Sequence, residues 1–241
     1  MASSTGSFPR PRRLHPERAL GGLFLALVLA ANFASAGMPD YLRAALKNFS
    51  PEVPPGWAYT QTTTRGDVTS TEHFDPAKPP EERWTLLRYN GAVPAPSDIE
   101  KYTRLKAANP APASSAVFTK ADIEPGSVEV VREDETRTEF KCAFRAESAG
   151  ADKMLAHLQL RLVVDKRTPH VESYQLDLLA PYNPVIGVKM NTLAVKVTFS
   201  APLPDRPGLP VVSTSHFQGR IFFIGTEENL RVEYSDFSRT E

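Results

Sequence analysis

The chain holds a single cysteine and none of the short motifs that mark common catalytic sites. One thiol, Cys142, cannot form an internal disulfide, so the fold must rest on its apolar core. The sequence contains no G-x-S-x-G elbow, no phosphate-binding loop and no dinucleotide fingerprint. These absences favour a protein without catalytic residues. A hydrolase whose site residues are dispersed along the chain stays open as an alternative.

An excess of charge of one sign is lacking too. The chain has 28 basic and 28 acidic residues, and they are interspersed rather than gathered in the basic stripe that a nucleic-acid binder needs. Four of its five histidines are His73, His157, His170 and His216, and none has a metal-binding spacing or an accompanying cysteine pair. We therefore expect no nucleic-acid partner, no metal and no cofactor.

The longest apolar run of the chain is short for a helix that crosses a bilayer. Residues 20–31 form an apolar run of about a dozen residues, where a membrane-spanning helix needs roughly 20. Arginines precede this run, and Ala34-Ser35-Ala36 follow it with the small residues that signal peptidase requires. We predict that residues 1–36 are a signal peptide cleaved after Ala36, and that residues 37–241 form a single periplasmic or secreted domain. A retained membrane anchor is the alternative.

Proline is abundant, with 22 residues, and it clusters between segments that alternate apolar and polar residues. This alternation is clear over residues 136–145, 157–164, 174–178 and 192–199, and it is typical of strands with one buried face. Acidic residues 133–135 and residues 165–169 have the composition of turns. The sequence predicts a mostly β (α+β) fold, which is a strongly curved antiparallel sheet or half-open β-barrel of about nine or ten strands.

Two short helices are expected as a lid over this sheet. The first covers residues 41–49 and follows Pro39-Asp40. The second covers residues 97–108, with Ser97 as N-cap and Glu100 at the capping-box position. The loop at residues 180–187 is interpreted as a rigid crossover whose apolar residues pack under the sheet, with a functional loop as the alternative.

Large apolar side chains are numerous on the predicted strand faces. They either fill a core or leave a cavity for an acyl chain or another apolar ligand. Cys142 shares a face with two phenylalanines, so we expect a buried thiol with a raised pKa and little reactivity. The candidate ligand-binding residues are Trp57, Tyr59, Trp84, Leu86, Phe140, Phe144, Leu160, Leu162, Tyr174, Leu176, Tyr182 and Phe199.

The order of the predicted elements resembles that of the LolA/LolB type of periplasmic lipoprotein carrier. A signal peptide leads to a short helix, a strand ending in Thr60-Gln61-Thr62, a helical insertion and late strands that include LQLRLVVDKRTPHVESYQLD. The resemblance implies an unclosed barrel with helices over an apolar cavity, and the transport of acylated proteins or lipids. The family's aromatic strand with an Arg-Pro pair has no counterpart here. The stretch RWTLLRYNG, preceded by FDP, is similar to secreted proteobacterial proteins.

We therefore expect an exported, non-catalytic binding or carrier protein for a lipid, an acylated protein or another amphiphile. Its partners would be an apolar or acylated ligand, an envelope protein and the membrane periphery. A packed β module that docks to an envelope protein is the first alternative, and the hydrolase named above is the second.

Overall fold

A computed structural model describes residues 38–108, 118–149 and 154–240, and residues 37–241 form one compact unit. The predicted signal peptide lies outside the described residues. Among the helices of the described ranges, none combines the length and the hydropathy of a membrane span.

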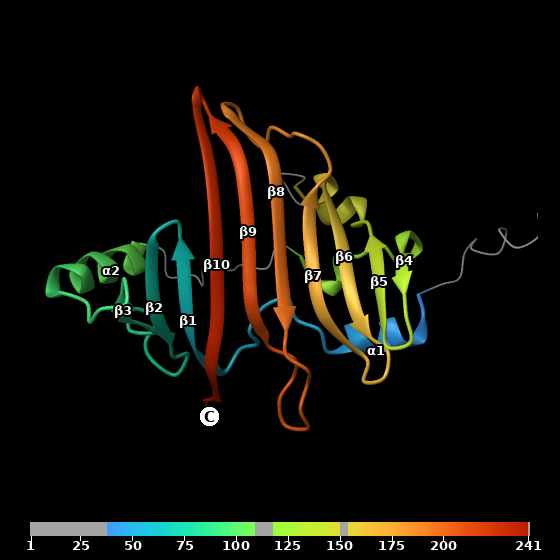
Figure 1. Cartoon of the computed structure of the whole chain (residues 1–241), viewed down its shortest axis with the longest axis horizontal. Coiled ribbons are helices and arrows are strands. Elements are labelled where there is room, and N and C mark those ends of the chain that lie inside the picture. Colours follow the sequence, from blue (N-terminus) through green and yellow to red (C-terminus); the bar gives the residue numbers. More distant parts are fainter. Residues whose placement is uncertain (1–37, 109–117, 150–153, 241) are drawn as a thin grey trace, which may run out of the picture. The chain divides into compact units, whose positions relative to one another are not determined.

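Ten antiparallel strands form one sheet that is not closed into a barrel, which confirms the predicted fold class (Figure 1). Its spatial order is β3-β2-β1-β10-β9-β8-β7-β6-β5-β4. The strands are β1 (Trp57–Arg65), β2 (Val68–Phe74), β3 (Trp84–Tyr89), β4 (Glu129–Glu133), β5 (Arg137–Cys142), β6 (Leu158–Asp165), β7 (His170–Leu178), β8 (Val188–Phe199), β9 (Pro210–Ile221) and β10 (Ile224–Arg239).

The last strand joins the two halves of the sheet. β10 pairs with β9 on one side and with β1 on the other, where Gln61 lies opposite Tyr234. The first three strands therefore extend the edge that the final strand provides. This placement brings residues near the N-terminal end of the unit, such as Gly56, into backbone contact with Thr240.

Two α-helices accompany the sheet, as the sequence predicts. Helix α1 (Asp40–Lys47) packs against β7, and helix α2 (Pro96–Ala108) lies against β3 (Figure 1). The predicted capping box of α2 is wrong. The helix begins with Pro96, which suits the first helical position, and the Asp98 carboxylate accepts a hydrogen bond from the Ala95 amide at 3.2 Å. Glu100 instead pairs with Arg104 one turn later.

The main core lies between α1 and strands β5–β8. Leu42 and Leu46 of α1 meet the inward faces of these strands, and Phe118, Ile123 and Leu155 complete the cluster. Side chains here are almost wholly excluded from water, so this half of the sheet rests on a filled interior. Cys142 belongs to this core, and burial raises the pKa of its thiol to about 12, as expected.

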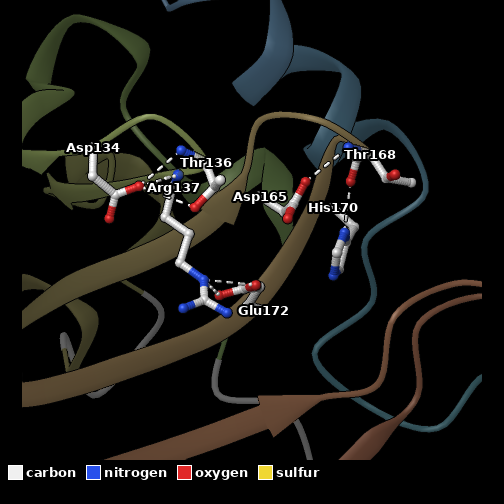
Figure 2. Close-up of polar contacts among 7 residues, drawn as sticks. All are labelled: Asp134, Thr136, Arg137, Asp165, Thr168, His170 and Glu172. Atoms are coloured by element: carbon white, nitrogen blue, oxygen red, sulfur yellow. Dashed lines mark hydrogen bonds and ion pairs between the residues drawn. The ribbon is translucent and has the colours of Figure 1, made fainter.

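The turns at one end of this half are fixed by side-chain caps (Figure 2). The Asp134 carboxylate accepts hydrogen bonds from the backbone amides of Thr136 and Arg137, both at 2.8 Å. Those bonds hold the pKa of Asp134 below its usual value. Arg137 then reaches across β6 and donates to Glu172 of β7 at 3.0 Å. The predicted acidic turn between β4 and β5 is confirmed.

The loop between β7 and β8 differs from the prediction. Tyr182 is half-buried, and it is tied to Met190 by two backbone hydrogen bonds. However, Val185 and Ile186 are 60% and 99% exposed, so they do not pack under the sheet. The ring of Phe222 lies against Gly187, 2.7 Å from the place that a Cβ atom at this position would occupy.

Candidate functional site

Half of the predicted ligand-binding residues lie inside the filled core. None of these six is more than 6% exposed, and all belong to the cluster beneath α1. Because their neighbours are other core side chains, they stabilise the fold rather than line the groove described below. They are Phe140, Leu160, Leu162, Tyr174, Leu176 and Phe199.

The other six predicted residues are spread over the unit. Phe144 packs at the edge of the same core, with its ring 5.4 Å from that of Phe118. Trp57 is half-buried at the start of β1. Tyr182 stacks on His157 at 3.9 Å between ring centroids. Tyr59, Trp84 and Leu86 belong to the opposite end of the sheet.

Tyr59 is the centre of a second aromatic cluster, on β1, β2, β3 and β10. Its ring lies 5.2 Å from Phe74, 6.0 Å from Trp84 and 5.8 Å from Tyr234, measured between centroids. Such edge and tilted pairs add to the stabilisation from burial alone. This cluster packs the part of the sheet formed by β1–β3. Beside it, a groove separates the sheet from α2.

A groove of about 460 Å³ lies between α2 and one face of β1–β3. The helix contributes residues three and four positions apart, which places them on one side of α2. Strands β1 and β2 contribute alternate residues, which share one face of the sheet. A register shift between β2 and β3 places Leu86 opposite Glu72 and Tyr89 opposite Ser70. The lining residues are Gln61, Thr63, Arg65, Val68, Ser70, Glu72, Leu86, Tyr89, Asp98, Lys101, Tyr102, Leu105 and Lys106.

A largely buried ion pair forms the floor of this groove. Lys106 Nζ lies 2.8 Å from Glu72 Oε2, and the two side chains are 21% and 10% exposed. Gln61 donates to the same carboxylate oxygen at 3.1 Å, while the Ser70 hydroxyl donates to Glu72 Oε1 at 3.3 Å. Hydrogen bonds from Lys106, Gln61 and Ser70 thus compensate for the removal of the carboxylate from water.

The Lys106 ammonium also lies over an aromatic face. Its Nζ is 3.9 Å from the centroid of the Trp84 ring and 5.3 Å from that of Tyr102. A cation at this distance is attracted by the negative face of the ring. Trp84 and Glu72 therefore fix the position of the ammonium group from two directions.

One buried donor beside this floor, the Trp84 indole nitrogen, has no hydrogen-bond partner among the described residues. Burial, the charge of Glu72 and a hydrogen bond to Glu72 raise the pKa of the Tyr102 phenol. An unmade hydrogen bond in a buried place is costly, and a ligand with an acceptor atom could make it.

The upper walls of the groove are more apolar. Val68 and Leu105 are 43% and 57% exposed, while Leu86 and Tyr89 are half-buried. This groove therefore offers apolar walls above a floor of fixed polar groups. In the described ranges, no group of three or more histidine, cysteine, aspartate or glutamate residues could hold a metal ion.

Sequence reasoning found Trp84 and Leu86 but missed the polar floor. Glu72 lies on β2 and was not among the predicted site residues. Its partner Lys106 is 34 positions away on α2, so no local pattern joins the two. A charged residue in an alternating strand, on the face that carries Phe74, is the one signal that could have marked the pair.

No family model and no curated protein matches the chain. Among solved structures, one described as GphF Dehydratase 1 aligns over 83% of this chain and 82% of its own length. The sequence identity is 9% and the TM-score is 0.17, a level at which a likeness carries no argument about fold or function.

Proposed function

We propose that this protein is an exported, non-catalytic binding protein for an amphiphilic ligand, such as a lipid or an acylated molecule, held in the groove between α2 and β1–β3. The observation that carries the proposal is the combination of apolar walls with a buried polar floor in one groove. Ligand sites are typically of this kind, largely apolar with a few placed polar groups.

The size of the groove suits part of an amphiphile. Its volume of about 460 Å³ falls inside the range of roughly 300–1,000 Å³ that small-molecule sites occupy. An acyl or other apolar portion would contact Leu86 and Leu105. A polar portion would lie next to the Lys106–Glu72 pair of the floor.

Release would follow from movement of α2. The helix contributes no fully buried residue, and its described contacts with the sheet include the Lys106–Glu72 pair. A helix with so little burial can separate from the sheet at a lower free-energy cost than α1, which places Leu42 and Leu46 in the core.

A packed module that docks to an envelope protein is the second candidate, and one observation favours it. The half of the sheet under α1 has an interior of packed apolar side chains. A docking module would use its surface alone and would need no groove.

Native mass spectrometry with lipid extraction tests the proposal on residues 37–241 purified from an exporting host. We expect a bound phospholipid or acylated molecule. A bare chain that also fails to bind a fluorescent fatty-acid analogue would contradict the proposal and favour the docking module.

A further inference from the structure

Five large apolar side chains project into solvent at one end of strands β8–β10. Val185 and Ile186 come from the β7–β8 loop, Phe222 and Phe223 form the β9–β10 turn, and Ile224 is the first residue of β10. Their exposed fractions are 60%, 99%, 65%, 96% and 73%, in that order. We call these five residues the apolar tip. Contiguous exposure of this kind marks a surface that meets a partner or a membrane.

The two loops of the apolar tip are held together as one element. Ile221 pairs with both Val188 and Ile224 across the sheet, and the Phe222 amide donates to the Gly187 carbonyl at 2.5 Å. The Phe222 ring lies where a side chain at position 187 would be, so only glycine fits there. Figure 1 shows this end of β8, β9 and β10 projecting beyond the ends of β1 and β7.

The turn itself is built from residues that such a turn disfavours. Phe222 occupies the first central position of a two-residue hairpin turn and has a φ of +52°, where glycine or asparagine is preferred. Phe223 occupies the second central position. A turn that served only to reverse the chain would not need two phenylalanines, one of them in a strained conformation.

The charged residues nearest to the apolar tip are basic, and the first acidic residue behind them on β10 is Glu227, which lines the same surface hollow as Arg220. Residues 179–191 and 218–226 contain no aspartate or glutamate, and their two charged residues are Lys189 and Arg220. These two residues face each other across β8 and β9, one position behind the pair of Val188 with Ile221. The chain therefore places two cations directly behind a set of exposed apolar side chains.

We propose that the apolar tip is a membrane-contact site, which inserts its side chains among the headgroups and upper acyl chains of a bilayer. Lys189 and Arg220 would then lie at the level of anionic headgroup phosphates. Interfacial segments combine apolar insertion with basic residues in this way. A second copy of the chain fits less well, because a symmetric contact would bring the same cations together.

This inference does not depend on a ligand in the groove. The test uses residues 37–241, a compact unit with its own core, because the apolar run in residues 20–31 could bind vesicles by itself. Phe223→Cys is labelled with a polarity-sensitive fluorophore, and Val93→Cys, at a site 85% exposed in the β3–α2 connection, is the matched control. The native Cys142 is buried and does not compete for the label.

Vesicles of phosphatidylcholine with phosphatidylglycerol should shift the emission of the label at position 223 to the blue and leave that at position 93 unchanged. In a flotation assay, the double variant I186S/F223S should bind these vesicles at least about tenfold more weakly, because two large side chains no longer leave water. Val93→Ser should bind as the unaltered chain does. Reversing the two cations in K189E/R220E should abolish the preference for anionic vesicles.

An unshifted label at position 223, or equal flotation of I186S/F223S and the unaltered chain, overturns the proposal. So does a dimer in solution that I186S/F223S dissociates without any vesicle binding, since the apolar tip would then meet a second copy. The groove variant Leu105→Arg should float normally. A loss of ligand binding with intact flotation would therefore separate the two proposals.

Discussion

Lys106 of α2 and Glu72 of β2 form a 2.8 Å ion pair that joins the helix to the sheet across 34 positions of sequence. The pair is mostly buried, and Trp84 covers the ammonium group. It sets the position of α2 over β1–β3, and with it the shape of the groove.

Removing the cation should destabilise the chain. Lys106→Met leaves the Glu72 carboxylate in a place that is only 10% exposed, so we expect a loss of about 2–4 kcal/mol in the free energy of unfolding by urea. The double variant K106M/E72Q should recover part of that loss, because no charge is then left buried. Equal stability of Lys106→Met and the unaltered chain would mean that the pair does not hold α2.

Truncation of a side chain to alanine should lower the free energy of unfolding far more in the core under α1 than on the surface of β4. Leu160 is 0% exposed, and Leu160→Ala should cost about 2–5 kcal/mol through lost burial and the cavity left behind. The matched control Val131→Ala removes an apolar side chain that is 53% exposed, and it should change stability by less than about 0.5 kcal/mol. Urea unfolding followed by tryptophan fluorescence measures both. Similar losses for the two variants would refute a filled interior in this half.

Alkaline pH should weaken the fold through Cys142. Burial raises the pKa of its thiol from an ordinary 9.0 to about 12, so the folded chain holds this proton more tightly than the unfolded chain. The protonated thiol therefore contributes fully to the free energy of unfolding below pH 9, and this contribution is lost as pH rises from 9 to 12. Burial raises the phenol pKa of Tyr59 and Tyr174 in the same direction.

The Cys142→Ala variant isolates the thiol. Between pH 9 and 10, the free energy of unfolding of this variant should fall less steeply than that of the unaltered chain. The two slopes should differ by up to about 1.4 kcal/mol per pH unit, the value for one proton. Thiol reagents should also leave native Cys142 unmodified and react only on unfolding. Rapid modification of the native chain at pH 8 would contradict the burial of this side chain.

A substitution in the strained β9–β10 turn should stabilise the chain, unlike the core substitutions above. Phe222→Gly relieves a positive φ, so the free energy of unfolding should stay equal or rise by up to about 1 kcal/mol. Phe223→Gly, at a neighbouring position without a positive φ, should bring no such gain. A marked destabilisation by Phe222→Gly would show that the packing of its ring on Gly187 outweighs the strain.

Much of the fold could be predicted because alternation is a local property. Leu158, Leu160 and Leu162 face one side of β6 as their spacing indicates, and both helices lie where proline and apolar spacing place them. The pairing of β1 with β10 could not be predicted. These strands come first and last in the sequence, and no local pattern indicates that they pair. The resemblance to lipoprotein carriers and the predicted export stay predictions.

The candidate site was harder to predict for the same reason. Aromatic residues are typical both of a core and of a ligand site, so the sequence does not distinguish Phe140 from Trp84. In the structure, Phe140 lies in the filled interior, whereas Trp84 lies beside the groove. The capping of α2 was predicted at Ser97, but the helix begins at Pro96. The capping carboxylate is that of Asp98, which accepts a hydrogen bond from the Ala95 amide. The apolar tip was missed because a turn rich in phenylalanine also has the composition of a strand.

The groove is tested most directly by titrating a fluorescent fatty-acid analogue into residues 37–241 and two variants of α2. Leu105 lines the groove, whereas Ile99 does not, and the two are 57% and 46% exposed. Leu105→Arg should weaken binding at least about tenfold by placing a charge against the apolar ligand, while Ile99→Arg should leave the affinity unchanged. Equal affinity of all three chains, or no binding by any of them, would contradict an amphiphile site between α2 and β1–β3.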